Sequence, residues 1–323
     1  MRALFFDGKS VKYKSFHPDP LPGPDEALIE IKAAGVCQTD LEIAKGYMNF
    51  KGILGHEFVG VVRRVSGKAG HELHGKRVAG EINCVCRECD MCARGLSAHC
   101  RNRDVIGIQN RDGCFADLLT LPVHNLHAIP DNVSDEQAVF VEPLAAAIQV
   151  LRQVQIDNRT KVAVLGDGRL GQLVAQVVKT LCPGVLLIGR HPAKLAIAER
   201  VGIQTKLDAD VHPRRDQDVV IDCTGRAEGL ERAIALVRPR GTLVMKTTVA
   251  AGKPLNLSPV VVDEITLLGS RCGPFRDAIA MLATRQVDVS GLVSRRMKLA
   301  DAEGVFAGNL PAEVVKIVLT FEK

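Results

Sequence analysis

The chain has 323 residues, of which 46% are hydrophobic and 24% charged, a composition typical of folded globular proteins. Its length favours two domains. The net charge of +5 arises from 42 basic and 37 acidic side chains that are mixed along the chain, so no basic block indicates nucleic acid binding. No run of 18 apolar residues occurs and the first nine residues lack a signal-peptide stretch, so we expect no membrane span and a cytoplasmic protein.

The first part of the chain, from Arg2 to about Asn132, predicts a mainly β domain. Short runs in which apolar and polar residues alternate are typical of half-buried strands, and glycine and proline turns separate them. The clearest runs are 27–32, 58–65 and 77–82.

Two short segments of this β part carry side chains that bind zinc well. Cys37 lies in Gly35-Val-Cys-Gln-Thr-Asp40, and His56 and Glu57 follow Gly55. A thiolate and an imidazole are good zinc ligands, and a site with three protein ligands keeps a position for substrate. Each residue taken alone is more often part of a core, so the zinc interpretation depends on the other motifs of the chain.

Four cysteines, Cys86, Cys89, Cys92 and Cys100, follow at spacings of C-x2-C-x2-C-x7-C. Four thiolates complete the tetrahedral shell of zinc, so such a site supports structure and leaves no open position. The alternative is a group of free thiols or disulfides. Cys84 has no place in the pattern and is expected to be a spare thiol.

The character of the chain changes near Glu142. Apolar strands are predicted at 161–165, 185–188, 218–223 and 241–245, and they alternate with helices predicted at 144–154, 172–181 and 192–201. Continuous apolar strands that alternate with helices indicate a doubly wound parallel α/β sheet covered on both faces. After about Ser270 we expect one more helix and a final strand at 316–321.

A glycine-rich turn, Gly166-Asp-Gly-Arg-Leu-Gly171, follows the first of these strands and opens a helix. Gly166 permits a tight turn, Gly168 lets a pyrophosphate approach the backbone, and Gly171 lets the helix pack on the strand. The amides of Arg169 and Leu170 at the helix N-terminus would bind the phosphates. This context predicts a dinucleotide site.

The second strand indicates which dinucleotide is bound. An NAD site usually ends this strand with Asp or Glu, which binds the ribose 2′-hydroxyl. Here the strand ends in Gly189-Arg190-His191, without a carboxylate. Gly189 leaves room for a 2′-phosphate, and Arg190 can pair with it, assisted by Lys194 or His191. The sequence therefore favours NADP(H) over NAD(H), with NAD bound through backbone contacts as the alternative.

Together, these motifs resemble the zinc-dependent medium-chain alcohol dehydrogenase family, in particular its sorbitol and threonine dehydrogenase branches. The resemblance covers essentially the whole chain. It implies a mainly-β GroES-like catalytic domain over 1–142 with a structural zinc loop at 84–100, a doubly wound parallel Rossmann sheet over 143–271, and a return to the catalytic domain over 272–323.

The resemblance also implies site residues and partners. Cys37, His56, Glu57 and Glu142 would serve the catalytic zinc, with Glu57 moving in and out of the shell, and the four-cysteine loop would hold a second zinc ion. Thr39 resembles the hydroxyl that relays the alcohol proton, although it could equally cap a helix. A small-molecule alcohol or carbonyl substrate is implied, as is a homodimer or homotetramer, with pairing between copies expected near 255–268.

Three departures limit the carry-over. Glu42 stands where some members continue the proton relay with histidine, the strand-end carboxylate is missing, and the chain is shorter than many relatives. The sequence therefore predicts a zinc-dependent alcohol dehydrogenase or carbonyl reductase linked to NADP(H). Alternatives are an NAD-linked polyol or amino-alcohol dehydrogenase, or a nucleotide-binding redox sensor whose zinc is only structural.

Overall fold

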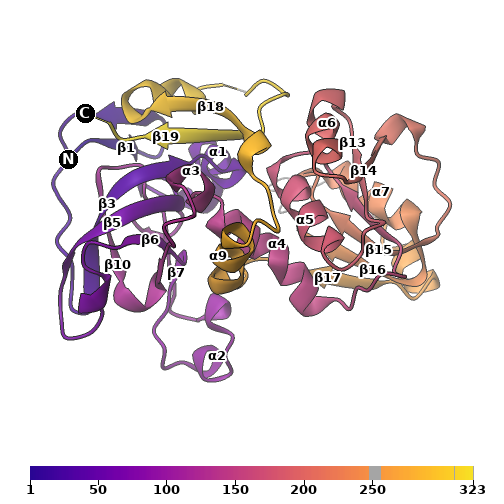
Figure 1. The fold of residues 1–323 in the computed structure, drawn as a ribbon, viewed down its shortest axis with the longest axis horizontal. Coiled ribbons are helices and arrows are strands. Elements are labelled where there is room, and N and C mark those ends of the chain that lie inside the picture. Colours follow the sequence, from indigo (N-terminus) through magenta and orange to yellow (C-terminus); the bar gives the residue numbers. More distant parts are fainter. Residues whose placement is uncertain (247–255, 309, 323) are drawn as a thin grey trace. The chain divides into compact units, whose positions relative to one another are not determined.

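The structure, a computed structural model, describes residues 1–246, 256–308 and 310–322. It forms two compact units, the first built from Met1–Glu142 together with Val293–Lys323 and the second from Pro143–Leu292 (Figure 1). Among the helices that the structure describes, none combines the length and the apolar character needed to span a bilayer.

The first unit is mainly β. Its main sheet has the strand order β11-β6-β5-β3-β19-β18, with β10 also paired to β3, and two three-stranded sheets accompany it in the orders β2-β1-β4 and β7-β8-β9. The strands are β1 (Ala3–Phe6), β2 (Val11–Lys14), β3 (Glu26–Gly35), β4 (Gly52–Ile53), β5 (Glu57–Val65), β6 (Arg77–Gly80), β7 (Asn83–Cys84), β8 (Asp104–Ile106), β9 (Asn110–Arg111), β10 (Leu118–Pro122), β11 (Leu126–Ala128), β18 (Val293–Lys298) and β19 (Lys316–Thr320).

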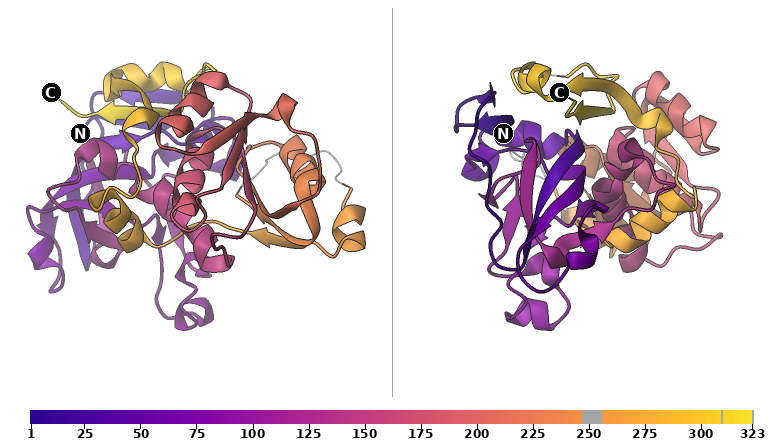
Figure 2. Two further views of the ribbon diagram at one scale, coloured as in Figure 1. Left: turned by 45° about the vertical axis from the view of Figure 1, so that its right-hand side comes forward. Right: turned by 60° about the vertical axis from the view of Figure 1, so that its left-hand side comes forward.

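Strand β3 shows why the sequence forms this sheet. Its residues alternate between partly exposed and buried along nearly the whole strand, as the apolar–polar alternation predicts. It pairs in antiparallel fashion with β5, β10 and β19, so the end of the chain completes the sheet that the beginning starts. Figure 2 shows that both termini of the chain, as well as strands β18 and β19, belong to this unit.

The helices of the first unit are α1 (Gln38–Ala44), α2 (Asp90–Ala93), α3 (Asp135–Ala138) and the start of α4 (Val141–Gln153).

The second unit contains one parallel sheet of six strands in the order β14-β13-β12-β15-β16-β17. Numbered along the unit, this is the order 3-2-1-4-5-6 of the Rossmann fold, which confirms the predicted fold class. The strands are β12 (Val162–Leu165), β13 (Leu186–Gly189), β14 (Gln204–Leu207), β15 (Gln217–Asp222), β16 (Val237–Met245) and β17 (Thr266–Gly269).

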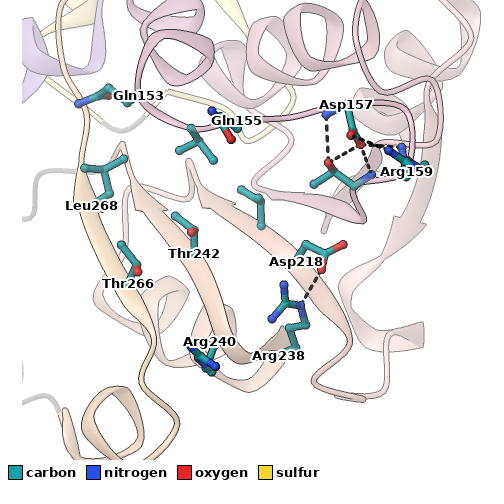
Figure 3. Close-up of a pocket in the computed structure, with 13 residues that line it drawn as sticks. Gln153, Gln155, Asp157, Arg159, Asp218, Arg238, Arg240, Thr242, Thr266 and Leu268 are labelled. Atoms are coloured by element: carbon teal, nitrogen blue, oxygen red, sulfur yellow. Dashed lines mark hydrogen bonds and ion pairs between the residues drawn. The ribbon is translucent and has the colours of Figure 1, made fainter.

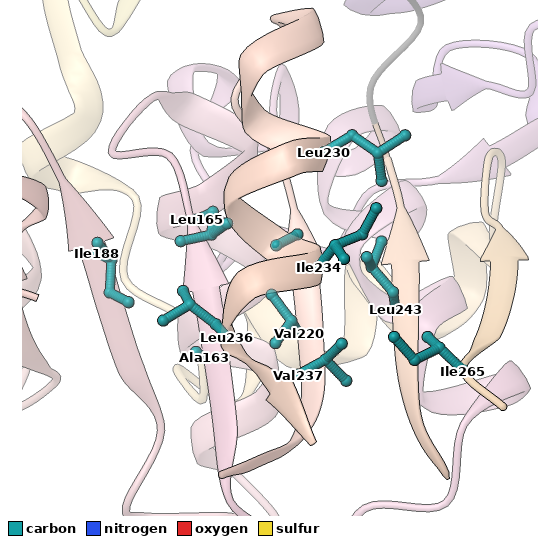
Figure 4. Packing of buried hydrophobic residues seen from close by; sticks show 11 residues of the cluster. Ala163, Leu165, Ile188, Val220, Leu230, Ile234, Leu236, Val237, Leu243 and Ile265 are labelled. Carbon is teal, nitrogen blue, oxygen red and sulfur yellow. The ribbon is translucent and has the colours of Figure 1, made fainter. Parts of the chain in front are cut away.

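The helices of this unit that lie between or after the strands are α5 (Arg169–Lys179), α6 (Pro192–Arg200), α7 (Ala227–Leu236), α8 (Ser258–Val262) and α9 (Phe275–Ala283). All of them except α8 bury apolar residues, whereas none of the residues of α8 is buried. Figure 4 shows α7 lying across the sheet, where Leu230 and Ile234 face Val220 of β15 and Leu243 of β16. Removing such side chains from water supplies the main favourable term in the stability of the unit.

The second unit extends further along the chain than the sequence indicates. The return to the first unit begins at Val293, not at 272, because residues 272–292 pack within the second unit. The Arg152 guanidinium contacts the Asp277 carboxylate of α9, and Gln176 of α5 exchanges hydrogen bonds with the backbone of Asp288. The segment predicted to pair between copies begins at Leu255, which lies outside the described residues.

Candidate active site

The first unit brings Cys37, His56 and Glu57 together. Gly35, at the end of β3, pairs with Glu57, at the start of β5, so the residues that follow one strand lie beside those that begin the other. One donor atom from each of Cys37, His56 and Glu57 lies within 4.8 Å of the others. His56 and Glu57 are buried and Cys37 is partly exposed, so this set has the donor chemistry and the partial access of an open zinc site.

Asp40 completes the surroundings of His56. Its carboxylate is fully buried in α1, where Oδ2 accepts a hydrogen bond of 2.8 Å from the Cys37 amide and Oδ1 lies 3.1 Å from His56 Nδ1. A carboxylate at one ring nitrogen orients the imidazole and leaves the other nitrogen for a metal. Burial alone would lower the pKa of His56, but Asp40 and Cys37 raise it well above its usual value. This negative environment favours a cation.

Lys316 of β19 also lies at this site, although the sequence did not predict it, and it forms an ion pair with Glu57. Both side chains are fully buried, and Lys316 Nζ also donates to the Val36 carbonyl oxygen at 3.3 Å. Gly35 makes room for the pair, since a Cβ there would overlap Lys316 and lie 2.7 Å from Glu57 Oε2. Burial lowers the pKa of Lys316 to about 8, while Cys37 and Asp40 oppose the shift.

The sequence also predicts Thr39 and Glu142 as site residues. Thr39 is close in sequence to Cys37, and Glu142 is the last residue before the boundary between the two units. Thr39 is in the first turn of α1, with its hydroxyl oxygen 3.7 Å from Cys37 Sγ. Glu142 is in the first turn of α4 and is partly exposed. Its carboxylate is not among the donors that lie within 4.8 Å of one another in the described chain. Its role as a zinc ligand stays a prediction.

The four predicted structural ligands converge in the loop that carries α2. Their sulfurs lie 3.4 Å apart for Cys86 and Cys100, 3.6 Å for Cys89 and Cys92, and 3.8 Å for Cys89 and Cys100. Four sulfurs at the corners of a tetrahedron around zinc are about 3.8 Å apart, since the Zn–S bond is about 2.3 Å. None of the ten cysteines forms a disulfide, which excludes that alternative in this structure.

The backbone around these cysteines favours thiolates. The Cys86 amide donates to Cys100 Sγ at 3.4 Å. Amides of Arg101 and Cys92 lower the pKa of Cys89 to about 6, whereas burial and the neighbouring cysteines raise the pKa of Cys92 to about 12. Four sulfurs this close cannot all be ionised without a cation between them, so the site fits zinc.

Cys84 stays apart from this set, as expected. It is buried at the end of β7, 3.9 Å from the Asn125 amide nitrogen, and burial raises the pKa of its thiol to about 11. A thiol that stays protonated at neutral pH is a weak metal ligand.

The glycine-rich turn lies between β12 and α5 of the second unit. Gly166 has φ +106°, and a Cβ there would lie 2.7 Å from the Cys223 carbonyl oxygen. A Cβ at Gly171 would overlap the Gly166 carbonyl, whereas one at Gly168 would meet no atom within 4 Å. The turn is therefore closed where helix and strand pack and open at the N-terminus of α5, which fits a dinucleotide pyrophosphate.

The end of β13 differs from the sequence interpretation in two respects. Gly189 and the exposed Arg190 are placed as expected, but Lys194 is buried in α6. A carboxylate does lie at this strand end, supplied by Asp167 of the glycine-rich turn. Its Oδ2 accepts hydrogen bonds of 2.7 Å from both the Arg190 and His191 amides. Strand β13 itself carries no carboxylate, as its sequence indicates, but the space at its end holds one from a neighbouring turn.

A polar cavity of about 670 Å³ lies at the end of the parallel sheet that is opposite the glycine-rich turn (Figure 3). It lies at the amino ends of β15, β16 and β17, whereas ligands of such sheets bind at the carboxyl ends. Its charged side chains are satisfied within the unit, with Arg238 Nε 2.6 Å from Asp218 Oδ1 and Arg240 Nε 3.4 Å from Glu264 Oε2. We assign it no part in the chemistry.

Each of the two units contains a segment that matches a known protein family. Residues 23–131 match the alcohol dehydrogenase GroES-like domain, and residues 170–285 match the zinc-binding dehydrogenase domain. An L-threonine 3-dehydrogenase from Chelativorans sp. is 30% identical over 93% of this chain and 93% of its own length. The chain belongs to the zinc-dependent medium-chain alcohol dehydrogenases.

Other members of this family show the same extent of similarity. A sorbitol dehydrogenase from Halalkalibacterium halodurans is 28% identical and covers 94% of both chains. Among solved structures, a zinc-binding dehydrogenase from Sinorhizobium meliloti bound to NADP is 29% identical, covers 99% of this chain and 98% of its own, and has a TM-score of 0.89. The predicted family and fold are confirmed, and the chain is an oxidoreductase of the alcohol dehydrogenase type.

The sequence interpretation missed Asp40, Lys316 and Asp167. Asp40 had a signal, because a carboxylate three residues after the helix-initiating Cys37 is placed to bind the Cys37 amide. Lys316 had none, since its partner lies far away in sequence. Asp167 stands in the quoted motif itself, but at a position that the glycine rule leaves unspecified.

Proposed function

We propose that this alcohol dehydrogenase transfers hydride between an alcohol, or the corresponding carbonyl compound, and NADP(H). The observation that carries the proposal is the convergence of Cys37, His56 and Glu57 in the first unit. A set of thiolate, imidazole and carboxylate with partial access suits a catalytic zinc ion more than a structural one. A redox sensor would have no use for such a site.

The chain's own residues supply most of the machinery. Bound zinc would lower the pKa of the substrate hydroxyl or polarise the substrate carbonyl. Cys37 and His56 would hold the ion, and Asp40 orients the His56 ring through Nδ1. In the oxidative direction the substrate loses its hydroxyl proton, which Thr39 receives and passes on, and its carbinol carbon loses hydride to the nicotinamide. Both steps reverse in carbonyl reduction.

Glu57 and Glu142 would complete the shell of the ion. In this structure Lys316 pairs with Oε2 of the Glu57 carboxylate, and Glu57 would serve the metal as a ligand that moves in and out of its shell. Glu142 serves in our proposal as the resting ligand, as the family resemblance implies. The four-cysteine loop would hold the second ion of the chain.

NADP(H) is the first choice of cofactor because Arg190 is exposed beside Gly189, where its guanidinium can pair with a 2′-phosphate. The NADP that is bound to the Sinorhizobium relative supports this choice. NAD(H) is the second candidate, and the observation that favours it is the Asp167 carboxylate at the same strand end.

The relatives suggest substrates to test. Their names include a sorbitol dehydrogenase, L-threonine 3-dehydrogenases and a 2-dehydro-3-deoxy-L-galactonate 5-dehydrogenase. We propose that a polyol, a hydroxy-amino acid or a sugar acid is the substrate here. A homodimer or homotetramer in a reducing cytoplasm remains part of the prediction.

The test is the initial rate of zinc-replete protein with NADP⁺ and with NAD⁺, each against a panel of simple alcohols, polyols, sugar acids and hydroxy-amino acids. We expect turnover of at least one panel member, faster with NADP⁺. Turnover with NAD⁺ alone would show that the cofactor choice is wrong. No turnover with either cofactor at two zinc ions per chain would contradict the proposed reaction. No turnover at about one zinc ion per chain would favour the sensor, whose zinc is only structural.

A further inference from the structure

If the protein binds a dinucleotide as proposed above, the second unit must distinguish NADP(H) from NAD(H) at the adenosine ribose. In Rossmann folds, a carboxylate at the end of the second strand usually recognises the ribose. In this chain that strand is β13, and its last residue, Gly189, has no side chain. The space beside Gly189 is nevertheless filled.

Asp167 fills it. This residue follows β12, which is the parallel neighbour of β13, so the carboxyl ends of both strands lie at one edge of the sheet. A Cβ on Gly189 would lie 2.5 Å from both Asp167 Cβ and Asp167 Oδ2. Any larger residue at position 189 would therefore collide with Asp167, so the two positions share one site and only one of them can carry a side chain.

The carboxylate is firmly held in this place. Oδ2 receives the two amide hydrogen bonds of 2.7 Å from Arg190 and His191, and His191 Nδ1 lies 3.0 Å from Oδ2 and 3.1 Å from Oδ1. The side chain is 8% exposed. Burial would raise the pKa of Asp167, but the hydrogen bonds from His191 and Arg190 outweigh it, so the group is ionised at neutral pH.

We infer that Asp167 determines dinucleotide selectivity by supplying, from the glycine-rich turn, the ribose-recognising carboxylate that β13 lacks. Oδ1 has fewer partners than Oδ2 and can accept a hydrogen bond from a ribose hydroxyl. A 2′-phosphate at the same place would meet a like charge, and the amides that could bind it are already taken by Oδ2.

Selectivity then depends on two opposing side chains. Arg190 attracts a 2′-phosphate and Asp167 repels it, so the NADP(H) preference proposed above requires that the attraction of Arg190 exceed the repulsion of Asp167. Removing the charge of Asp167 should increase the preference for the 2′-phosphate whichever dinucleotide the wild-type protein prefers.

The experiment measures binding of adenine-side fragments, which need neither the nicotinamide nor catalysis. Dissociation constants of ADP-ribose and 2′-phospho-ADP-ribose are determined by calorimetry on the zinc-replete full-length chain. We expect Asp167→Asn to change the ratio of the two constants by about tenfold in favour of 2′-phospho-ADP-ribose. The substitution removes the repulsion of the 2′-phosphate, and it also removes the charged acceptor for the ribose hydroxyl of ADP-ribose.

A matched control comes from Asp157. This aspartate also accepts backbone hydrogen bonds, from the amides of Arg159 at 2.9 Å and Thr160 at 3.1 Å, but it stands before β12 at the opposite edge of the sheet. Asp157→Asn should leave the ratio unchanged. A purely structural role for Asp167 would weaken both fragments equally.

The double variant Asp167→Gly/Gly189→Asp returns the carboxylate to the strand end and guards against a folding defect. It should shift the ratio back toward that of the wild-type protein. An unchanged ratio in Asp167→Asn, with both fragments still bound, would overturn the inference and leave the proposed function intact. Wild-type protein that binds neither fragment would instead overturn the dinucleotide part of the proposed function, and the inference with it.

Discussion

At the scale of single residues, the ion pair between Lys316 and Glu57 is the most unusual feature, since both side chains are fully buried. Two charges removed from water are tolerable only together, because each compensates the desolvation of the other. The pair also holds the Glu57 carboxylate beside Cys37 and His56. It thus links the stability of the first unit to the position of a proposed metal ligand.

Lys316→Met keeps the length of the side chain but leaves Glu57 buried without its cation. We expect this change to lower the free energy of unfolding by about 3–5 kcal/mol, as is typical when one partner of a buried pair is removed. Urea unfolding measures it. The double variant Lys316→Met/Glu57→Gln should recover most of the loss, and a single variant as stable as wild type would show that the pair contributes nothing.

Asp167 gives a prediction for pH. Burial is the largest single influence and opposes ionisation of Asp167, but the hydrogen bonds from His191 and Arg190 together outweigh it and keep its pKa below the usual value. The native state therefore binds this proton less readily than the unfolded state, so the ionised group stabilises the fold at neutral pH and the contribution fades as acid protonates it.

Asp167→Asn should accordingly be less stable than wild type at pH 7, by about 1–2 kcal/mol. The difference should shrink as the pH falls below about 4, where aspartate protonates in the unfolded chain and then in the native one. Denaturant unfolding of both proteins from pH 7 to the acid limit of the native state measures it. A difference that grows on acidification contradicts this assignment.

At the scale of elements, the loop around α2 depends on its metal more than on its packing. The helix has only four residues, none of them buried, and Leu96 of the same loop is exposed. Four thiolates around one ion replace the missing core, because metal binding and local folding are coupled.

Cys89→Ser should therefore reduce bound zinc from two ions per chain to one and make residues 86–100 readily cleaved by protease. Cys84→Ser removes a buried thiol outside the set and should retain both ions. Metal analysis and limited proteolysis of the two variants provide the measurement. Equal zinc content in both would mean that the four cysteines do not form the second site.

Most elements could be predicted from local pattern. The alternation in β3, the apolar runs of β12 and β13, and the turn after β12 each reflect an interaction between near neighbours in sequence. The shift of the second-unit boundary to Leu292 could not, because it depends on contacts of α9 with α4 that join residues far apart in the chain.

The candidate site divides in the same way. Cys37, His56, Glu57 and the four cysteines were predictable because ligand type and spacing are local properties. The ion pair was not, because β19 brings Lys316 beside β3 only once the sheet has formed. Asp167 was missed for a related reason. The sequence rule looks for the ribose-binding carboxylate at the end of β13, whereas Asp167 belongs to the turn after β12 and reaches the end of β13 only in the folded sheet.

At the scale of the whole molecule, the proposed reaction requires both units. The first carries the candidate metal sites and the second carries the dinucleotide turn. Strand β19, near the end of the chain, contributes to the first unit and places Lys316 against Glu57 of the candidate site. The proposed function requires that hydride transfer occur at the cluster of Cys37, His56 and Glu57.

The most direct test is the initial rate of His56→Ala on a substrate that the wild-type protein turns over, with zinc content measured on the same sample. His56 is buried beside Asp40 and distant in sequence from the four-cysteine loop, so the variant should keep one zinc ion. We expect the rate to fall by about 1,000-fold or more, which corresponds to several kcal/mol of lost polarisation. A rate within about tenfold of wild type would contradict the assignment of the active site.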